Sequence, residues 1–467
     1  MSSLVPTAAC ALLILFLLFL QREPKARTSW ALWIPTLWVV FAMSRPLTAW
    51  LYAEPLVPTA SQYVEGSPLD RLVLGALMLG GIVVLLCRYR RAARFLRANW
   101  PVLLFFTFCA VSVLWSDFPG VALKRWVRAS GDLTMVMIIL TERESLAAFK
   151  RIIVRAGFLL VPLSILLIEF YPSLGQVYSI EDGRIANIGV TTNKNTLGSI
   201  CMIIGLASVW RIIALFRENS RIGRQLIAHG SILAMCLWLL YVANSSTSKA
   251  CFLLGLGMIL FLNFGGKKRT VRAHLIVAAV ACVALFIVAM PEAYASIVHA
   301  LGRKPDLTGR TDLWKAILSV DFNHWFGTGY MSFWLGSRLQ YLWGLFYFYP
   351  QEAHNGYLEI YINLGRIGLV FMGLLLAAGY RNVVAAFRSD PATGAFRLAF
   401  FVVALVYNFT EAAFRMNDPI WIFLLLTVSA IPSIRARKEH AWVERVDPNE
   451  LAEGPEGGDA YVYEEIA

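Results

Sequence analysis

The stretch TLGSICMIIGLASVWRIIALF, residues 196–216, holds a single charged side chain, Arg211. The hydrocarbon core of a bilayer is about 30 Å thick, so a helix that crosses it needs roughly 20 mostly apolar residues. This stretch meets that requirement, and similar runs recur on both sides of it. The pattern predicts a chain that passes through a membrane many times.

The apolar runs before and after residues 196–216 predict an all-α polytopic membrane protein with about 12–13 transmembrane helices. The composition agrees, because 58% of the residues are hydrophobic and only 15% are charged, which is far more apolar than a soluble domain. The predicted spans are residues 4–20, 31–49, 72–87, 101–115, 127–140, 152–170, 196–216, 226–243, 250–264, 274–290, 357–380, 396–409 and 419–431.

The cations behind the net charge of +12 lie in short clusters between the apolar runs. Lys and Arg in short loops mark the cytoplasmic side of a membrane protein. We therefore expect no nucleic-acid partner, and we expect the loops between the clusters to face outward. The predicted cytoplasmic clusters fall within residues 22–27, 88–97, 143–151, 217–224, 267–272, 381–397 and 435–438.

The domain organisation follows from these loops. Residues 1–432 form the predicted transmembrane domain, with residues 4–20 taken as a retained first span, and residues 433–467 form a cytoplasmic tail that is predicted to be disordered. The outward loops are residues 115–126, 171–195, 244–249 and a long, aromatic-rich segment, 291–355. Loops this long are usually functional or disordered, and aromatic content argues against disorder. The seven cysteines have no paired spacing, so neither a metal site nor a disulfide frame is expected.

Three cations, Lys124, Arg125 and Arg128, break the rule that outward loops carry little positive charge. One explanation is an anionic ligand at the outer surface, because Arg and Lys bind phosphate through charge-assisted hydrogen bonds. The alternatives are a lipid headgroup contact and a different topology at this point.

Two residues flank the second part of the long loop. Arg310 lies at a predicted turn into a helix, where an arginine is usually a helix-end residue. His354 lies where the loop meets the next span, and histidine is suited to exchange a proton near neutral pH, although an interfacial histidine is more often structural.

Polar side chains also occur on two late spans. Asn355, Glu359 and Asn363 fall on one helix face, which should point into the protein. Glu411 and Arg415 are four residues apart, and a structural ion pair is the simplest interpretation.

Together these segments resemble the O-antigen ligase and polymerase superfamily, and within it exopolysaccharide polymerisation proteins of the ExoQ type. The resemblance implies an inverting, metal-independent glycosyltransferase of the GT-C type in the bacterial inner membrane, with its active site on the periplasmic face. It also implies a donor glycan on undecaprenyl diphosphate, an acceptor glycan, surrounding membrane lipid, no cofactor and a chain-length regulator as a further candidate partner. The segments are Trp115-Ser-Asp-Phe-Pro119, Asn193-Lys-Asn195, Ser246-Thr-Ser-Lys249, Gly309-Arg310 with Trp314, His354-Asn-Gly-Tyr-Leu-Glu359 and Thr410-Glu411.

The resemblance assigns roles to individual residues. His354 is the expected general base, and Arg310 is expected to hold the diphosphate. The ligases have an arginine where this chain has Lys249, which keeps the charge but loses the bidentate grip. The expected substrate-binding residues are Lys249, Arg125, Lys124, Lys194, Asn355 and Glu411.

Two other functions stay open. A ligase that moves O-antigen to lipid A core shares the donor, the fold and the motifs. A flippase or transporter of lipid-linked glycans would have as many spans, but it usually carries ions in mid-membrane and shows pseudo-repeats.

Overall fold

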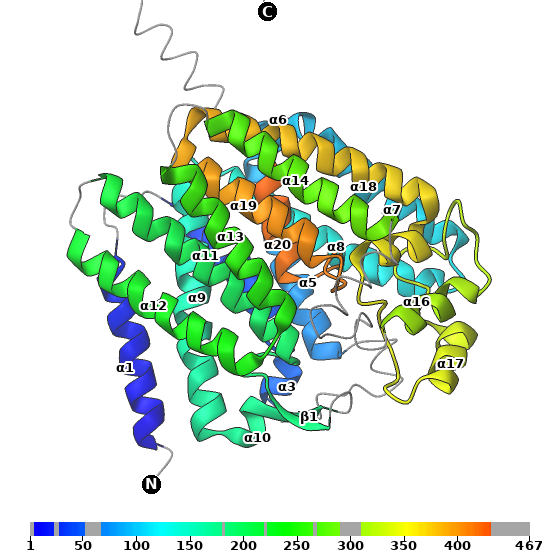
Figure 1. Ribbon diagram of the computed structural model, residues 1–467, viewed down its shortest axis with the longest axis horizontal. Helices are drawn as coiled ribbons and strands as arrows, with labels where there is room; N and C mark the ends of the chain where they lie inside the picture. The colour runs from blue at the N-terminus through cyan, green and yellow to red at the C-terminus, as the bar shows by residue number, and fades with distance from the viewer. Residues whose placement is uncertain are drawn as a thin grey trace, which may run out of the picture.

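The computed structural model describes residues 4–22, 28–51, 67–179, 183–218, 222–264, 269–289 and 310–430. The regular secondary structure in this part of the chain is helical apart from one two-stranded hairpin (Figure 1). Residues 291–309 of the predicted long loop and the predicted tail, 433–467, lie outside the described residues.

The helices of the first half, in chain order, are α1 (Leu4–Leu20), η1 (Trp30–Leu32), α2 (Trp33–Ala42), α3 (Leu47–Leu51), α5 (Pro68–Cys87), α6 (Tyr89–Ala98), α7 (Trp100–Val111), η2 (Ser112–Trp115), α8 (Pro119–Leu140), α9 (Ser145–Phe170) and α10 (Pro172–Gly175). After α10 come β1 (Gln176–Ser179) and β2 (Arg184–Asn187), which pair antiparallel with Val177 opposite Ala186. The remaining helices are α11 (Lys194–Glu218), α12 (Ile222–Ala243), α13 (Ser246–Phe264), α14 (Arg269–Ala289), α16 (Arg310–Ser319), α17 (Gly336–Leu345), α18 (Gly356–Ser389), α19 (Pro391–Tyr407) and α20 (Pro419–Val428).

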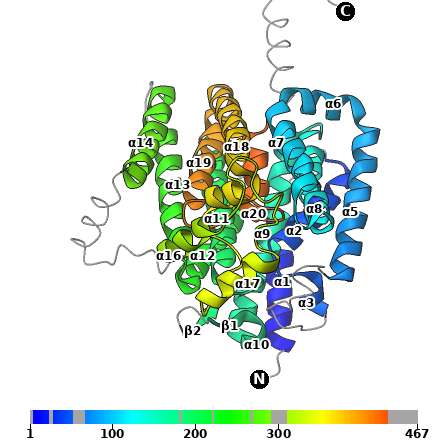
Figure 2. The ribbon, with the colours of Figure 1, turned by 90° about the vertical axis from the view of Figure 1, so that its right-hand side faces the viewer.

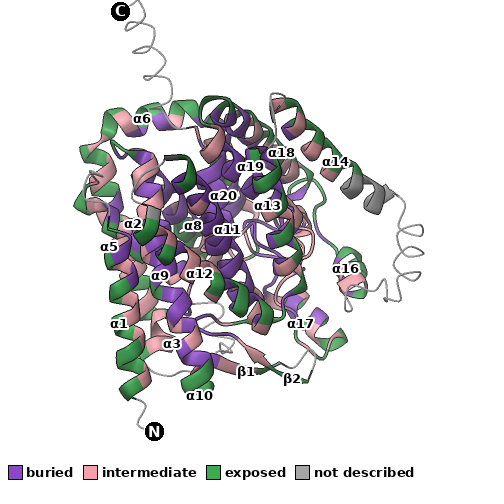
Figure 3. Cartoon of the chain, turned by 60° about the vertical axis from the view of Figure 1, so that its left-hand side comes forward, coloured by how far each residue is buried: buried purple, intermediate pink, exposed green. Residues whose placement is uncertain are grey.

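The core lies around α11, α19 and α20, with α1, α3 and α5 on one side of it and α14 on the other (Figure 3). In the most apolar 18-residue stretch of α11, 89% of the residues are buried, whereas in the corresponding stretch of α5 only 6% are buried. Trp210 of α11 stacks on Phe396 of α19 with ring centroids 5.0 Å apart. Such contacts hold the central helices together, while α5 presents its apolar side chains to the lipid.

The all-α polytopic membrane fold is confirmed by these helices. Six described helices are long and apolar enough to cross a membrane, or seven if α6 and the helix that follows it form one span bent by 89°. Five shorter apolar helices of 10–17 residues accompany them. The cation-rich α6 lies at one end of the molecule, and α10, the hairpin and α17 lie at the other (Figure 2).

One predicted loop is wrong. Residues 115–126 were expected to connect two spans, but α8 begins at Pro119 and is helical through Leu140. Proline is favoured in the first turn of a helix because its missing N–H has no partner there. Lys124 and Arg125 therefore lie on a helix, in its second turn.

The described part of the long loop is folded. Its helices α16 and α17 pack around a second apolar cluster that includes Phe333 and Trp334. Residues 323–329 then lie against a break in α18 at Gly365, which has φ 67°. A Cβ at Gly365 would lie 2.2 Å from the Trp325 carbonyl carbon, so this close approach requires glycine.

Candidate active site

A cavity of about 810 Å³ lies between α8, α11, the chain before α18, and the connection from α19 to α20. A cavity of this size is in the range of ligand sites. It brings together polar residues that are far apart in the sequence. The polar and charged residues among its lining include Arg125, Arg128, Lys194, Asn195, Glu352, His354, Glu359, Asn363, Glu411 and Arg415.

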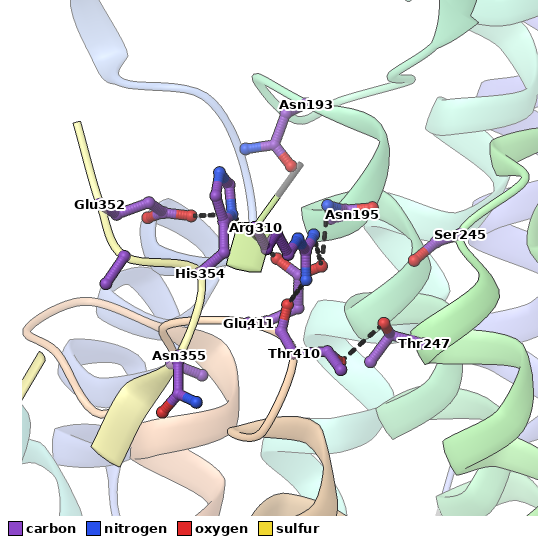
Figure 4. Close-up of polar contacts among 12 residues, drawn as sticks. Asn193, Asn195, Ser245, Thr247, Arg310, Glu352, His354, Asn355, Thr410 and Glu411 are labelled. Atoms are coloured by element: carbon purple, nitrogen blue, oxygen red, sulfur yellow. Dashed lines mark hydrogen bonds and ion pairs between the residues drawn. The ribbon is translucent and has the colours of Figure 1, made fainter. Parts of the chain in front are cut away.

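Glu411 is the carboxylate that joins the two residues expected to carry the chemistry (Figure 4). Its Oε1 accepts hydrogen bonds from Arg310 Nη2 and from Asn195 Nδ2, each at 3.0 Å. Its Oε2 lies 3.7 Å from Nδ1 of His354. Arg310 also donates to the carbonyl of Thr410. The predicted proximity of Arg310 and His354 is confirmed, because both contact one buried carboxylate.

Local backbone structure positions His354. Its φ is 48°, a left-handed conformation that is uncommon for residues other than glycine. The next residue, Asn355, caps α18 by accepting hydrogen bonds from the backbone N–H groups of Tyr357 and Leu358, each at 3.0 Å. Asn355 therefore has a structural role at the helix start, and it holds the backbone that aims the His354 ring.

Backbone strain concentrates at this cavity. Five described non-glycine residues have positive φ, and four of them line it: Met331, Tyr349, His354 and Asn417. Each such residue costs of order 1–3 kcal/mol and persists only where the surroundings hold it, which is typical of functional sites.

A second carboxylate completes the surroundings of His354. Glu352 Oε1 lies 3.1 Å from His354 Nδ1, and Glu352 also accepts from Arg415. Burial would raise the pKa of Glu352, but the charge of Arg415 and contact with His354 lower it to about 2. Burial would lower the pKa of His354, but Glu352 and Glu411 raise it to about 10. In this structure the ring is therefore protonated at neutral pH.

The ligand atoms of Glu352, His354 and Glu411 lie within 4.8 Å of one another, a spacing that could hold a metal ion. Each carboxylate already has a cationic partner, however, since Arg310 pairs with Glu411 and Arg415 pairs with Glu352. The donor set is therefore arranged to balance guanidinium groups, and a metal ion would have to compete with both.

The other expected substrate-binding residues divide into two groups. Arg125 and Lys194 line the cavity, and Arg125 donates to the carbonyl of Met331. Lys124 and Lys249 are not among the described residues that line it. Lys124 is exposed, and Lys249 donates to Asn244 Oδ1 at 2.9 Å.

Two predictions about polar pairs have different outcomes. The expected ion pair between Glu411 and Arg415 is wrong, because Arg415 pairs with Glu352 and lies 3.8 Å from Asp418. The polypeptide between α19 and α20 is not a regular helix, so a spacing of four does not bring these side chains together.

The inward polar face of α18 is confirmed for two residues, since Asn363 Nδ2 donates to Glu359 Oε2 at 3.1 Å and Asn363 is buried.

Sequence reasoning missed the role of Glu352. The available signal was its place in the chain, two residues before His354 in the same predicted segment. Which acidic residue faces the ring depends on the positive φ of His354, and nothing in the residue types indicates that conformation.

Comparison with known proteins agrees with this geometry. Residues 231–373 match a family model described as O-Antigen ligase, a range that contains Arg310 and His354. The exopolysaccharide production protein ExoQ of Rhizobium meliloti (strain 1021) is 24% identical over 358 residues, which cover 74% of this chain and 80% of that protein. These matches confirm the resemblance of the chain to the O-antigen ligase and polymerase superfamily, with an ExoQ protein among its relatives.

Proposed function

We propose that the protein transfers a glycan from an undecaprenyl diphosphate carrier to a hydroxyl of an acceptor glycan, and so polymerises repeat units of exopolysaccharide or O-antigen. The observation that carries the proposal is the buried Glu411 carboxylate, which contacts both Arg310 and His354 beside a large cavity. A proton-transfer group and a cation for a leaving diphosphate are what this reaction needs within reach of one sugar.

The proposed reaction is a single displacement. The acceptor hydroxyl oxygen forms a bond to the anomeric carbon while the bond from that carbon to the phosphate oxygen breaks. The electron pair of the broken bond leaves with the lipid diphosphate, and the hydroxyl proton passes to a base. Attack opposite the leaving group inverts the anomeric configuration.

His354 is the proposed base. Its two carboxylate partners stabilise the imidazolium that forms when the ring takes the proton. The same partners keep the resting ring protonated, so the ring must lose that proton before each transfer. The pH dependence of the rate therefore tests this role directly.

Cations around the cavity are proposed to stabilise the leaving diphosphate without a metal ion. Arg310 presents a planar guanidinium, which binds phosphate oxygens in pairs. Lys194 lies at the start of α11 and lines the same cavity. The positive end of a helix dipole adds to the charge of a lysine at this position.

The proposed location is the bacterial inner membrane, with the cavity on the periplasmic side. The supporting observation is that α17 and the hairpin lie opposite the cation-rich α6 (Figure 2). Alkaline phosphatase fused after Lys304 should be active, and fusions after Arg94 and Arg269 should be inactive. Activity at either of the latter two positions would contradict the topology.

An O-antigen ligase is the second candidate, because the matching family model carries that description. The test is to supply purified protein in nanodiscs with a lipid-linked repeat unit as its only glycan. A polymerase should produce lipid-linked chains of several repeats, whereas a ligase should produce none until lipid A core is added. Absence of product in both mixtures would contradict the proposed reaction.

A further inference from the structure

Arg128 is a cavity-lining arginine that the proposed transfer step does not use. It lies on α8, one turn beyond Arg125. A charged side chain on a helix of a membrane protein is costly and usually serves a function.

The Arg128 guanidinium is held by a neutral group. With the Asn417 amide oxygen turned toward α8, that oxygen accepts from Arg128 Nη2 and Nε at 2.8 and 3.0 Å. In the described part of the chain, no carboxylate oxygen forms an ion pair with Arg128 within 4.0 Å. Asp132, one turn further along α8, uses its two oxygens to accept from Trp38 Nε1 and from the Asn417 N–H, each at 2.8 Å.

This arrangement differs from that of the other arginines at the site. Arg310 and Arg415 each have a carboxylate within ion-pair distance, whereas Asp132 and Asp70 act on the charge of Arg128 from further away. The two donors of Arg128 instead converge on one amide oxygen, and a phosphate oxygen offers the same geometry with a full negative charge. An anionic ligand in the cavity can therefore replace Asn417 as the partner of Arg128.

The helices α2 and α5, which pack against α8, give the cavity apolar side chains, and α5 also contributes the acidic Asp70. Phe41 of α2, Leu47 of α3, and Val73 and Leu74 of α5 line the cavity. Since only 6% of the most apolar stretch of α5 is buried, this wall borders the outside of the helix bundle, where lipid lies. An anionic group beside an apolar wall at the bundle edge fits a ligand with a phosphate head and a hydrocarbon tail.

We propose that Arg128, with Arg125 beside it, binds the diphosphate of a second lipid-linked glycan, which is the acceptor of the transfer. The inference rests on the proposed polymerase function, in which both reacting glycans are attached to carrier lipids. Two diphosphates repel each other, so they need separate cations. Arg310 and His354 serve the donor, and Arg128 and Arg125 on α8 serve the acceptor.

The test counts bound lipids by native mass spectrometry, with undecaprenyl diphosphate that carries no sugar as the probe. The wild-type protein should bind two molecules. Arg128→Gln and Arg310→Gln should each bind one, and Arg128→Lys should retain two but hold the second about tenfold more weakly, because lysine lacks the bidentate grip. Lys124→Gln is the matched control, since it removes an exposed cation of the same helix, and it should still bind two.

The outcomes separate the two proposals. One bound molecule in the wild type, or two in Arg128→Gln, would overturn the acceptor site and leave the proposed reaction standing. No bound molecule in the wild type would contradict the proposed donor as well. A parallel series with phosphatidylglycerol identifies the ligand, because loss of that lipid alone in Arg128→Gln would show that Arg128 holds an ordinary phospholipid and would also overturn the proposal.

Discussion

The pH dependence of transfer tests whether His354 acts as the base. A histidine ordinarily titrates near pH 6.5. Although burial lowers the pKa of His354, Glu352 and Glu411 raise it to about 10. The difference favours the protonated ring by about 5 kcal/mol, which leaves roughly one ring in 10³ neutral at pH 7. If the neutral ring takes the proton, the rate should rise about tenfold for each pH unit from pH 6 to pH 9.

Glu352→Gln sharpens this test. The substitution keeps the shape of the side chain but removes one of the two carboxylates that raise the pKa of His354. Arg415 keeps Asp418 as a partner, 3.8 Å away. The pKa of His354 should fall, so the rate of the variant should level off at a lower pH than that of the wild type.

The assay follows release of undecaprenyl diphosphate from a lipid-linked repeat unit by protein in nanodiscs, from pH 6 to pH 9. Thermal unfolding at each pH serves as the control for loss of folded protein. A wild-type rate that is flat or falls over this range would refute the assignment of His354 as the base. The proton would then have to pass to a carboxylate, with His354 acting in its charged form.

Four substitutions provide further tests. His354→Ala should lower the transfer rate by about 10²- to 10⁴-fold while the amount of protein in the membrane, measured by immunoblot, stays unchanged; a long polymer at the normal level would contradict a catalytic role. Arg310→Lys should lower transfer about tenfold or more, because lysine cannot make the bidentate contact, and comparable turnover would remove Arg310 from diphosphate binding. Lys249→Arg should leave polymer length in cells unchanged, since it retains the cation, and shortened polymer would show that the lysine itself is required. Gly365→Ala should destabilise the protein by about 1–3 kcal/mol from backbone strain alone, seen as a lower melting temperature in detergent, and an unchanged melting temperature would argue against the tight contact with Trp325.

Hydropathy predicted most of the fold because the bilayer imposes a length and a composition on each span. The first helix, Leu4–Leu20, has the expected bounds. Other helices extend past the apolar run into the cation clusters, as α18 does to Ser389, since charged residues at the membrane surface remain helical. The start of α8 was missed for the related reason that its first turns carry cations.

The site was predicted in part. The motifs identified Arg310, His354 and Glu411, and the fold brings the first two, from separate segments, to the Glu411 carboxylate. The pairing of Glu352 with Arg415 could not be read from spacing, because it crosses from the chain before α18 to the chain before α20. Such contacts depend on how irregular segments pack, and no periodic pattern encodes that.

The break in α18 has a consequence for how a lipid substrate reaches the cavity. Around Gly365, residues 323–329 supply hydrogen bonds that the interrupted helix lacks. Before the break, Thr328 N–H donates to the Ile362 carbonyl at 3.1 Å and Gly329 N–H to the Asn363 carbonyl at 2.9 Å. After it, Arg366 N–H donates to the His324 carbonyl at 3.0 Å and Ile367 N–H to the Trp325 carbonyl at 3.2 Å. Moving this segment away would leave backbone groups without partners in a setting where each costs several kcal/mol. This wall of the site is therefore fixed. Under the proposed function, we expect the polyprenyl chain to enter from the bilayer on the side of α5, where only 6% of the most apolar stretch is buried.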